Sequence, residues 1–417
     1  MRWMLACALL GACASAEQAG SNGAADAGPT TNGDGAPATP DAPQDPRRGW
    51  IDLGDPPGAA AGDAQAPRLA MWNGAPVVAY SADQHVRVYA YANDSAWTAV
   101  GDPLRHSSAA NVVTYDPTPV AGADVLSVVW PEWSGGAMTS AVRRLANGAW
   151  VAPPGAASVG APNAYSFVPH STAAVDRADG SMWLAYSETL DINAPMRISV
   201  VSILGSTVAL RGSSISATGT NSGALAPELA IGGGAQFMTW TENGVRLAKR
   251  NPATGAWEAY GQSPLALPGR DVSSHANPHL AVDDTGRPIV AFTSYDGAES
   301  SIYVARWEGT AWSYWAQALQ ATPGPVGNMT SHTYLYDIVA AGPDVAYVAW
   351  SELDASMKDG IYVYRCTPAG CVKVGRGRLT PGYGPRLAVD GAGRVLVAWV
   401  EAGRPHVWRY HGDPDAP

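Results

Sequence analysis

The stretch PHLAVDDTGRPIVAFTSYDGAESSIYVARWEGTAWSYW, residues 278–315, predicts four short antiparallel strands joined by turns. Gly286 closes the first turn, because glycine readily adopts the positive φ that a tight hairpin requires. The run 288–293 is almost entirely apolar and too short for a helix, which favours a buried strand. Residues 302–307 alternate with the period of a half-exposed strand, and a second glycine turn leads into 312–315. A unit of this length and order is typical of one blade of a β-propeller.

The same unit recurs along the chain, and each copy is recognised by the aromatic residue that ends its second strand. Successive aromatics are about 49 to 58 residues apart, a longer period than that of leucine-rich or ankyrin repeats. These anchor aromatics are Tyr80, Trp130, Tyr186, Trp240, Phe292, Trp350 and Trp399. The pattern predicts an all-β propeller of seven four-stranded blades, with six or eight blades as the alternatives if a weak copy is misread.

The last copy, residues 385–413, ends after its third strand. A matching fourth strand stands at the start of the folded body, where GWIDLGDPP (49–57) resembles AWTAVGDPL (96–104), the end of the first copy. We therefore expect an N-terminal strand to complete the last blade. That pairing would close the ring and remove the exposed strand edges of an open sheet.

The N-terminus predicts export. Residues 1–12, MRWMLACALLGA, combine an early arginine with a short apolar core, which is typical of a signal peptide and too short to span a membrane. The sequence Leu-Gly-Ala-Cys that ends at Cys13 resembles the lipobox of bacterial lipoproteins, in which the cysteine is lipidated. An ordinary signal peptide is the alternative. By the sorting rule of enterobacterial lipoproteins, Ala14 after this cysteine favours the bacterial outer membrane.

Residues 13–48 are rich in Ala, Gly, Pro and Asp and contain almost no large apolar side chain. Such a segment buries too little surface to offset the entropy lost on ordering, so we expect a disordered tether. The propeller then occupies residues 49–417.

The turns before several fourth strands end in Gly-x-Trp, as in NGAW (147–150) and TGAW (254–257). These hairpins resemble the turns of Asp-box repeats, and the whole body resembles the seven-bladed propellers with sialidase-like repeats. The diagnostic Asp-box string Ser-x-Asp-x-Gly-x-x-Trp is absent from every copy. The resemblance therefore implies a shared architecture and transfers no activity.

Cysteines and charge limit the chemistry further. Cys366 and Cys371 flank a predicted strand turn, which in an exported protein predicts a disulfide, with two free thiols as the alternative. The net charge is −10 and no basic cluster is present, so nucleic acid is not an expected partner. The sequence has no P-loop, dinucleotide-binding glycine motif, nucleophile elbow or HExxH motif. We expect no cofactor and leave an axial or structural metal ion open.

Polar residues recur beside the loops that should surround the propeller axis. A glutamate follows the anchor aromatic by two residues in five copies, and histidines stand at the start of several first strands. The candidate ligand-binding residues are His106, His170, His275, His279, His332, Glu132, Glu188, Glu352 and Glu401, with Glu242 as the fifth repeated glutamate. Such a ring could bind a cation or a sugar. Alternatively, the glutamates are structural and pair with arginines on the third strands.

Two tryptophans, Trp133 and Trp315, lie outside the repeated positions and are candidates for stacking on a sugar face.

The leading hypothesis is a non-catalytic, lipid-anchored propeller of the cell envelope that binds protein or glycan through its loop face. A sialidase-like glycoside hydrolase is an alternative, although no arginine triad with a Tyr/Glu pair is evident. A lectin with a sugar site on every blade is a third hypothesis, which the irregular loops disfavour.

Overall fold

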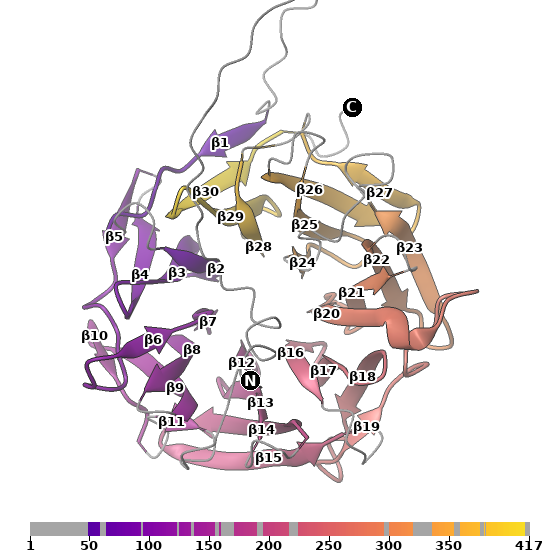
Figure 1. Cartoon of the computed structure of the whole chain (residues 1–417), viewed down its shortest axis with the longest axis horizontal. Helices are drawn as coiled ribbons and strands as arrows, with labels where there is room; N and C mark the ends of the chain where they lie inside the picture. The colour runs from indigo at the N-terminus through magenta and orange to yellow at the C-terminus, as the bar shows by residue number, and fades with distance from the viewer. Residues whose placement is uncertain are drawn as a thin grey trace, which may run out of the picture. The chain divides into compact units, whose positions relative to one another are not determined.

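Seven antiparallel sheets follow one another along the chain and form the blades of a ring (Figure 1). The computed structural model describes residues 49–58, 64–92, 95–122, 125–134, 137–154, 158–159, 171–189, 195–216, 224–295, 300–319, 336–353, 359–375, 379 and 381–412. All of these lie in the unit Gln44–Pro417. The predicted signal peptide, Cys13 and the tether lie outside the described residues.

The first three blades are built in chain order. Blade 1 comprises β2 (Gln65–Trp72), β3 (Ala75–Ala82), β4 (His85–Ala92) and β5 (Ala96–Ala99). Blade 2 comprises β6 (Val112–Thr114), β7 (Thr118–Ala121), β8 (Leu126–Ser134), β9 (Ala137–Ala146), β10 (Ala149–Val151) and β11 (Ser158–Val159), with β6 and β7 sharing the innermost place beside β8. Blade 3 comprises β12 (Ser171–Val175), β13 (Met182–Glu188), β14 (Arg197–Leu204) and β15 (Thr207–Ile215).

The next three blades repeat the same meander. Blade 4 comprises β16 (Leu225–Gly232), β17 (Ala235–Thr241), β18 (Val245–Arg250) and β19 (Trp257–Ala259). Blade 5 follows the short helix η1 (Val272–Ser274) and comprises β20 (His275–Val282), β21 (Pro288–Tyr295), β22 (Ser300–Trp307) and β23 (Trp312–Leu319). Blade 6 comprises β24 (Tyr336–Ala340), β25 (Ala346–Leu353), β26 (Asp359–Thr367) and β27 (Gly370–Lys373).

The last blade joins both ends of the propeller. Its strands are β28 (Tyr383–Val389), β29 (Val395–Glu401), β30 (Arg404–Tyr410) and β1 (Trp50–Asp52). β1 pairs antiparallel with β30, so the N-terminal strand supplies the outer strand of the blade. The predictions of seven blades and of ring closure by residues 49–57 are both confirmed.

The core lies between the blades rather than within any one of them. Among the described residues, seven apolar clusters each join two neighbouring blades, including blade 7 to blade 1. Every anchor aromatic is buried and packs against the preceding blade; Trp350 of blade 6, for example, contacts Ala291 and Val304 of blade 5 in one cluster. Burying one such aromatic contributes about 2–3 kcal/mol, which explains why this position recurs in the sequence.

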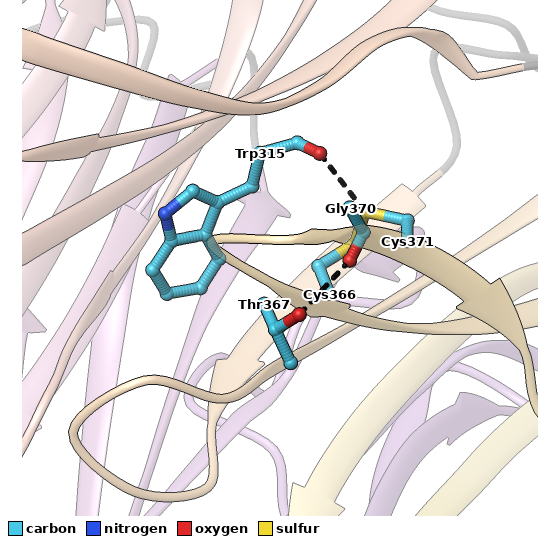
Figure 2. Close-up of a disulfide and its surroundings, with 5 residues drawn as sticks. All are labelled: Trp315, Cys366, Thr367, Gly370 and Cys371. Carbon is cyan, nitrogen blue, oxygen red and sulfur yellow. Dashed lines mark hydrogen bonds between the residues drawn. A yellow bond between two sulfur atoms is a disulfide. The ribbon is translucent and has the colours of Figure 1, made fainter. Parts of the chain in front are cut away.

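The predicted disulfide is confirmed. Cys366 and Cys371 pair directly across β26 and β27 and are bonded to each other, as Figure 2 shows. The carbonyl oxygen of Trp315 in blade 5 lies 3.9 Å from Cys371 Sγ. Trp315 itself is buried, with the guanidinium of Arg306 4.6 Å from its ring centroid. The prediction that Trp315 stacks on a ligand is therefore wrong, because this indole packs inside the propeller.

No helix in the described ranges is long and apolar enough to cross a bilayer.

Candidate functional site

Seven side chains, one from each innermost strand, occupy the same place in their blades. Each stands opposite the residue that precedes the anchor aromatic on the neighbouring strand. The pairs are Arg68–Ala79, Thr118–Val129, Thr172–Ala185, Glu228–Thr239, His279–Ala291, Asp337–Ala349 and Arg386–Ala398. The strands that carry them, β2, β7, β12, β16, β20, β24 and β28, surround the centre of the ring (Figure 1). We call these seven first-strand residues the axial ring.

Six members of the axial ring line a single cavity of about 180 Å³. They are Arg68, Thr118, Thr172, Glu228, Asp337 and Arg386. The remaining lining comes from the residues that follow five of them: Leu69, Pro119, Ala173, Leu229 and Leu387. A molecule of liquid water occupies about 30 Å³, so the cavity has room for roughly six waters or a small polar ligand.

A β-bulge precedes the axial ring in several blades. The strand register shifts just before Arg68, Glu228, His279 and Arg386. Proline stands immediately before the ring residue in five blades: Pro67, Pro117, Pro227, Pro278 and Pro385. Because proline cannot donate to a β-ladder and a bulge re-aims the next side chain, this local sequence turns the ring residue at the end of the strand.

One arc of the axial ring is held together by direct contacts. Thr172 Oγ1 donates a hydrogen bond to Glu228 Oε2 at 3.2 Å. His279 Nδ1 lies 3.7 Å from Glu228 Oε1 and also 3.7 Å from Asp337 Oδ1. The imidazole of His279 thus bridges two carboxyl groups that come from the strands on either side of its own.

The same arc continues into blade 7 through the backbone. Asp337 accepts hydrogen bonds from the N–H of Leu387 at 2.8 Å and from the N–H of Ile338 at 2.9 Å. Arg386 Nη1 donates in the opposite direction, to the carbonyl oxygen of Tyr336, at 2.8 Å. Both carboxyl oxygens of Asp337 are therefore engaged by the protein.

Arg68 and Arg386 form the arc of the neighbouring blades 1 and 7, and the Nε donor of each has no partner among the described residues. Within the described ranges, Arg68 forms no hydrogen bond and no ion pair, and its Nε is buried. Arg386 is 9% exposed, and its Nε is likewise buried without a hydrogen-bond partner among the described residues. Unpaired buried donors are costly, and charged ones especially so, which marks this arc as a place for an acceptor group.

The electrostatics reflect this crowding of charge. Burial, and then the nearby charge of Arg68, lower the pKa of Arg386. Burial lowers the pKa of Arg68 too, but Glu228, Asp116 and Asp337 outweigh it and leave that pKa raised. Burial also raises the pKa of Glu228 and of Asp337, against the opposing effect of the two arginines. Two guanidinium groups and two carboxyl groups thus share one small buried space.

The repeated glutamates lie elsewhere, inside the blades. Glu132, Glu242 and Glu352 are buried, and each accepts a hydrogen bond at 2.9 Å from the indole N–H of the anchor tryptophan two residues earlier. Glu188 follows a tyrosine instead and accepts from Ser199 Oγ at 2.6 Å, with Arg197 Nε 3.6 Å away. These contacts match the structural alternative, although indole groups supply most of the partners in place of arginines.

Glu401 is half-buried at the end of β29 and does not line the cavity. His106 contacts Glu132 through its backbone: the N–H groups of His106 and Ser107 donate hydrogen bonds to the Glu132 carboxylate at 2.8 and 2.6 Å. His275 is fully buried beside Phe292 at the start of β20. Of the predicted ligand-binding residues, only His279 joins the axial ring, and a ligand-binding role for the others stays a prediction.

His170 and His332 lie outside the described residues. Across the ranges that the structure describes, no three His, Cys, Asp or Glu side chains are arranged to hold a metal ion.

Sequence reasoning missed six of the seven ring residues. The available signal is the motif Pro-x-Leu-Ala, present as PRLA (67–70), PELA (227–230), PHLA (278–281) and PRLA (385–388). Its second position is the ring residue in each case. This second position is difficult to recognise as a site, because it changes from basic to acidic between copies. Repeats are recognised by the positions that stay the same.

Comparisons with known proteins show the fold alone. No protein-family model and no curated protein matches the chain. Among solved structures, the polysaccharide lyase Uly1 aligns with a TM-score of 0.50 at 9% identity, covering 86% of this chain and 92% of that one. Trypanosoma rangeli sialidase aligns at 0.46 and 11% identity over 84% and 55% of the two chains, and the fucose-specific lectin of Aleuria aurantia at 0.43 and 14% over 76% and 98%.

The chain spans about half the length of the sialidase chain that it matches. At these low identities a shared fold does not carry an activity from one protein to another. Sialidases are among the similar structures, and the structure itself is a propeller of seven blades, the architecture predicted from the repeats.

Proposed function

We propose that this protein is a non-catalytic binding protein whose axial ring holds a small acidic saccharide by its carboxylate. The observation that supports this most is the pair of arginines on blades 7 and 1. Arg68 and Arg386 line the axial cavity, and each keeps a buried Nε without a partner among the described residues.

An anion is the group that best matches these donors. Guanidinium groups bind carboxylates through paired, charge-assisted hydrogen bonds, which are stronger than neutral ones. Burial, and then the nearby charge of Arg68, lower the pKa of Arg386, so the positive charge of Arg386 is disfavoured at this site. A carboxylate between the two guanidinium groups would favour that charge and supply the missing acceptors.

The rest of the lining suits the hydroxyl groups and the apolar face of a sugar. Thr118 and Thr172 offer hydroxyl groups, and Glu228 offers carboxyl oxygens. Leu69 and Leu229 add apolar surface beside them. The lining is thus mostly polar, with a smaller apolar part, which suits a sugar better than an apolar ligand. The small volume favours a single sugar residue, such as the end of a glycan, over a long chain.

We infer from the predicted signal peptide and lipobox that the protein binds its ligand outside the cell. A lipid on Cys13 would anchor the propeller to the bacterial outer membrane through the tether of residues 13–48. Replacing Cys13 by Ala should then release the protein from the membrane fraction. If the variant stays with the membranes, the anchor is misassigned, and the saccharide proposal is unaffected.

A glycoside hydrolase is the second candidate, and one observation favours it. Glu228 and Asp337 both lie 3.7 Å from His279 Nδ1, so the facing carboxyl oxygens are separated by at most twice that distance. Catalytic pairs in glycosidases are about 5–9.5 Å apart and include one carboxyl group of raised pKa. Against this role, both oxygens of Asp337 accept hydrogen bonds from backbone N–H groups. Release of p-nitrophenol from p-nitrophenyl glycosides, abolished in Glu228→Gln, would favour the hydrolase.

A glycan array tests the binding proposal broadly. The purified propeller should retain glycans that end in a carboxylated sugar and ignore their neutral counterparts. Retention of neutral glycans alone would contradict the role of the arginines. Silence on all glycans would favour a protein partner instead, which is the other class of ligand that the sequence leaves open.

A further inference from the structure

We infer that the ligand of the axial ring also carries a positive charge, so that it is a small zwitterion with a protonated amine held at Glu228. This inference rests on the proposed binding of an acid by Arg68 and Arg386 and specifies the chemical class of that acid.

Charge is distributed unevenly around the axial ring. Blades 7 and 1, which are neighbours, carry Arg386 and Arg68. Blades 2 and 3 carry only threonines at this position. The acidic members stand on blades 4 and 6, on either side of His279 on blade 5. In the order of the ring, the threonines separate the arginine pair from Glu228 on blade 4, so the cavity presents a cationic side and an acidic side.

Glu228 is the acidic group with capacity for a ligand. An ionised carboxylate has about four acceptor sites. Glu228 uses one oxygen for the hydroxyl of Thr172 and has the other 3.7 Å from His279. Both oxygens of Asp337, in contrast, receive backbone N–H groups. Of the two carboxylates in the cavity lining, Glu228 therefore accepts fewer hydrogen bonds from the described residues and keeps more acceptor capacity for a ligand.

Charge balance favours a zwitterion over a simple acid. The two arginines of the axial ring are balanced by its two carboxylates, and Asp116 adds a further negative charge that acts on both arginines. A bound monoanion would leave a net negative charge in a buried space, which carries a large desolvation cost. A zwitterion adds no net charge, and its two poles can pair with opposite sides of the cavity. The amine would also favour the ionised form of Glu228, whose pKa burial raises against the opposing effect of Arg68 and Arg386.

A series of linear probes can measure this without knowledge of the natural ligand. 4-Aminobutanoate and 6-aminohexanoate carry both charges at two separations. Butanoate and hexanoate keep the carbon chain and the negative charge but lack the amine. Butylamine and hexylamine keep the carbon chain and the positive charge but lack the carboxylate. Calorimetric titration of the full propeller should show one amino acid binding at least about ten-fold tighter than both of its single-charge analogues, because each analogue lacks one of the two charge-assisted hydrogen bonds.

Substitutions of Glu228 and Arg68 test which residue binds the amine and which binds the carboxylate of the probe. Glu228→Gln should lower the affinity for the preferred amino acid to that of the alkanoate, and Arg68→Gln should lower it to that of the amine. Glu258→Gln, on the exposed strand β19, is the matched control and should change nothing. Unchanged unfolding midpoints establish that each variant is folded.

The outcomes separate this inference from the proposed function. Equal affinity for alkanoate and amino acid, with loss in Arg68→Gln, would overturn the zwitterion and leave the acid-binding site standing. Amine binding that equals amino acid binding and is insensitive to Arg68→Gln would overturn both. Absence of binding by every probe, together with a silent glycan array, would also overturn both.

Discussion

Trp50 lies directly opposite Tyr410 across strands β1 and β30, with their ring centroids 5.1 Å apart, although these residues begin and end the propeller. The backbone N–H of His411 donates to the carbonyl of Gly49 at 2.6 Å beside them. His406 Nδ1 lies 2.7 Å from Asp55 Oδ1 and adds a polar contact at the other end of the strand. The ring is thus closed by non-local pairing rather than by a chain connection.

Removing the Trp50 side chain should open this closure. Trp50→Ala is expected to lower the free energy of unfolding by about 3–5 kcal/mol, because the indole is buried in the cluster that joins blades 6 and 7. The control is Ile51→Ala on the same strand, whose side chain points to solvent at 45% exposure and should cost about 0.5 kcal/mol at most. Urea unfolding measures both. Equal effects of the two substitutions would contradict ring closure through β1.

The architecture could be predicted from the sequence, because the same physical need recurs in every blade. Each interface requires one large buried aromatic, so Trp130, Trp350 and the other anchors repeat at a readable spacing. Closure of the ring could also be predicted from the sequence, because GWIDLGDPP has the pattern of a fourth strand. The sequence could not show that Trp315 is buried, because the apolar cluster that contains it includes residues of the next blade, blade 6, as well as of its own repeat.

The candidate site was less accessible to sequence reasoning. The glutamates attracted attention because they repeat, and they repeat because the anchor indoles need an acceptor, as between Trp350 and Glu352. The axial ring is built from residues that differ between blades, as expected if one ligand were to present a different group to each blade. Arg68 and Glu228 therefore have nothing in common except their register, which only the folded ring reveals.

The indole–carboxylate contact should contribute measurably to stability. Glu352→Leu leaves the buried N–H of Trp350 without this acceptor, so the free energy of unfolding should fall by about 1–3 kcal/mol. Glu401→Leu is the control, because no hydrogen bond joins Glu401 to the indole of Trp399 in blade 7. It should change stability by about 0.5 kcal/mol at most. A loss in Glu401→Leu as large as that in Glu352→Leu would refute this role.

The disulfide should stabilise blade 6 to a modest degree. It closes a short loop, with a sequence separation of 5 residues, so the chain-entropy effect amounts to about 2 kcal/mol. Reductant should therefore lower the unfolding midpoint of the natural protein and leave that of the double variant Cys366→Ala, Cys371→Ala unchanged. A midpoint that does not respond to reductant in the natural protein would show that the bond adds no stability.

Acid should weaken the propeller partly through His275. Burial is the main factor that lowers the pKa of this imidazole, so the folded chain binds the proton less readily than the unfolded chain. The contribution of His275 is then complete above its ordinary pKa of about 6.5 and declines as the pH falls below that value. Unfolding of the natural protein and of His275→Gln at about pH 7.5 and about pH 5.5 measures this. The natural protein should lose more stability than the variant, and parallel losses would contradict the assignment.

The arginine pair of the axial ring should bind an acidic sugar, and calorimetric titration of D-glucuronate measures that binding. Arg68→Gln is the best variant, because this side chain forms no hydrogen bond with any described residue and its loss should leave the fold intact. Arg404→Gln, on the exposed surface of β30, is the control. We predict that the natural protein and Arg404→Gln bind D-glucuronate equally and that Arg68→Gln binds at least about ten-fold more weakly. Equal binding by all three proteins, or no binding by the natural one, would contradict the account.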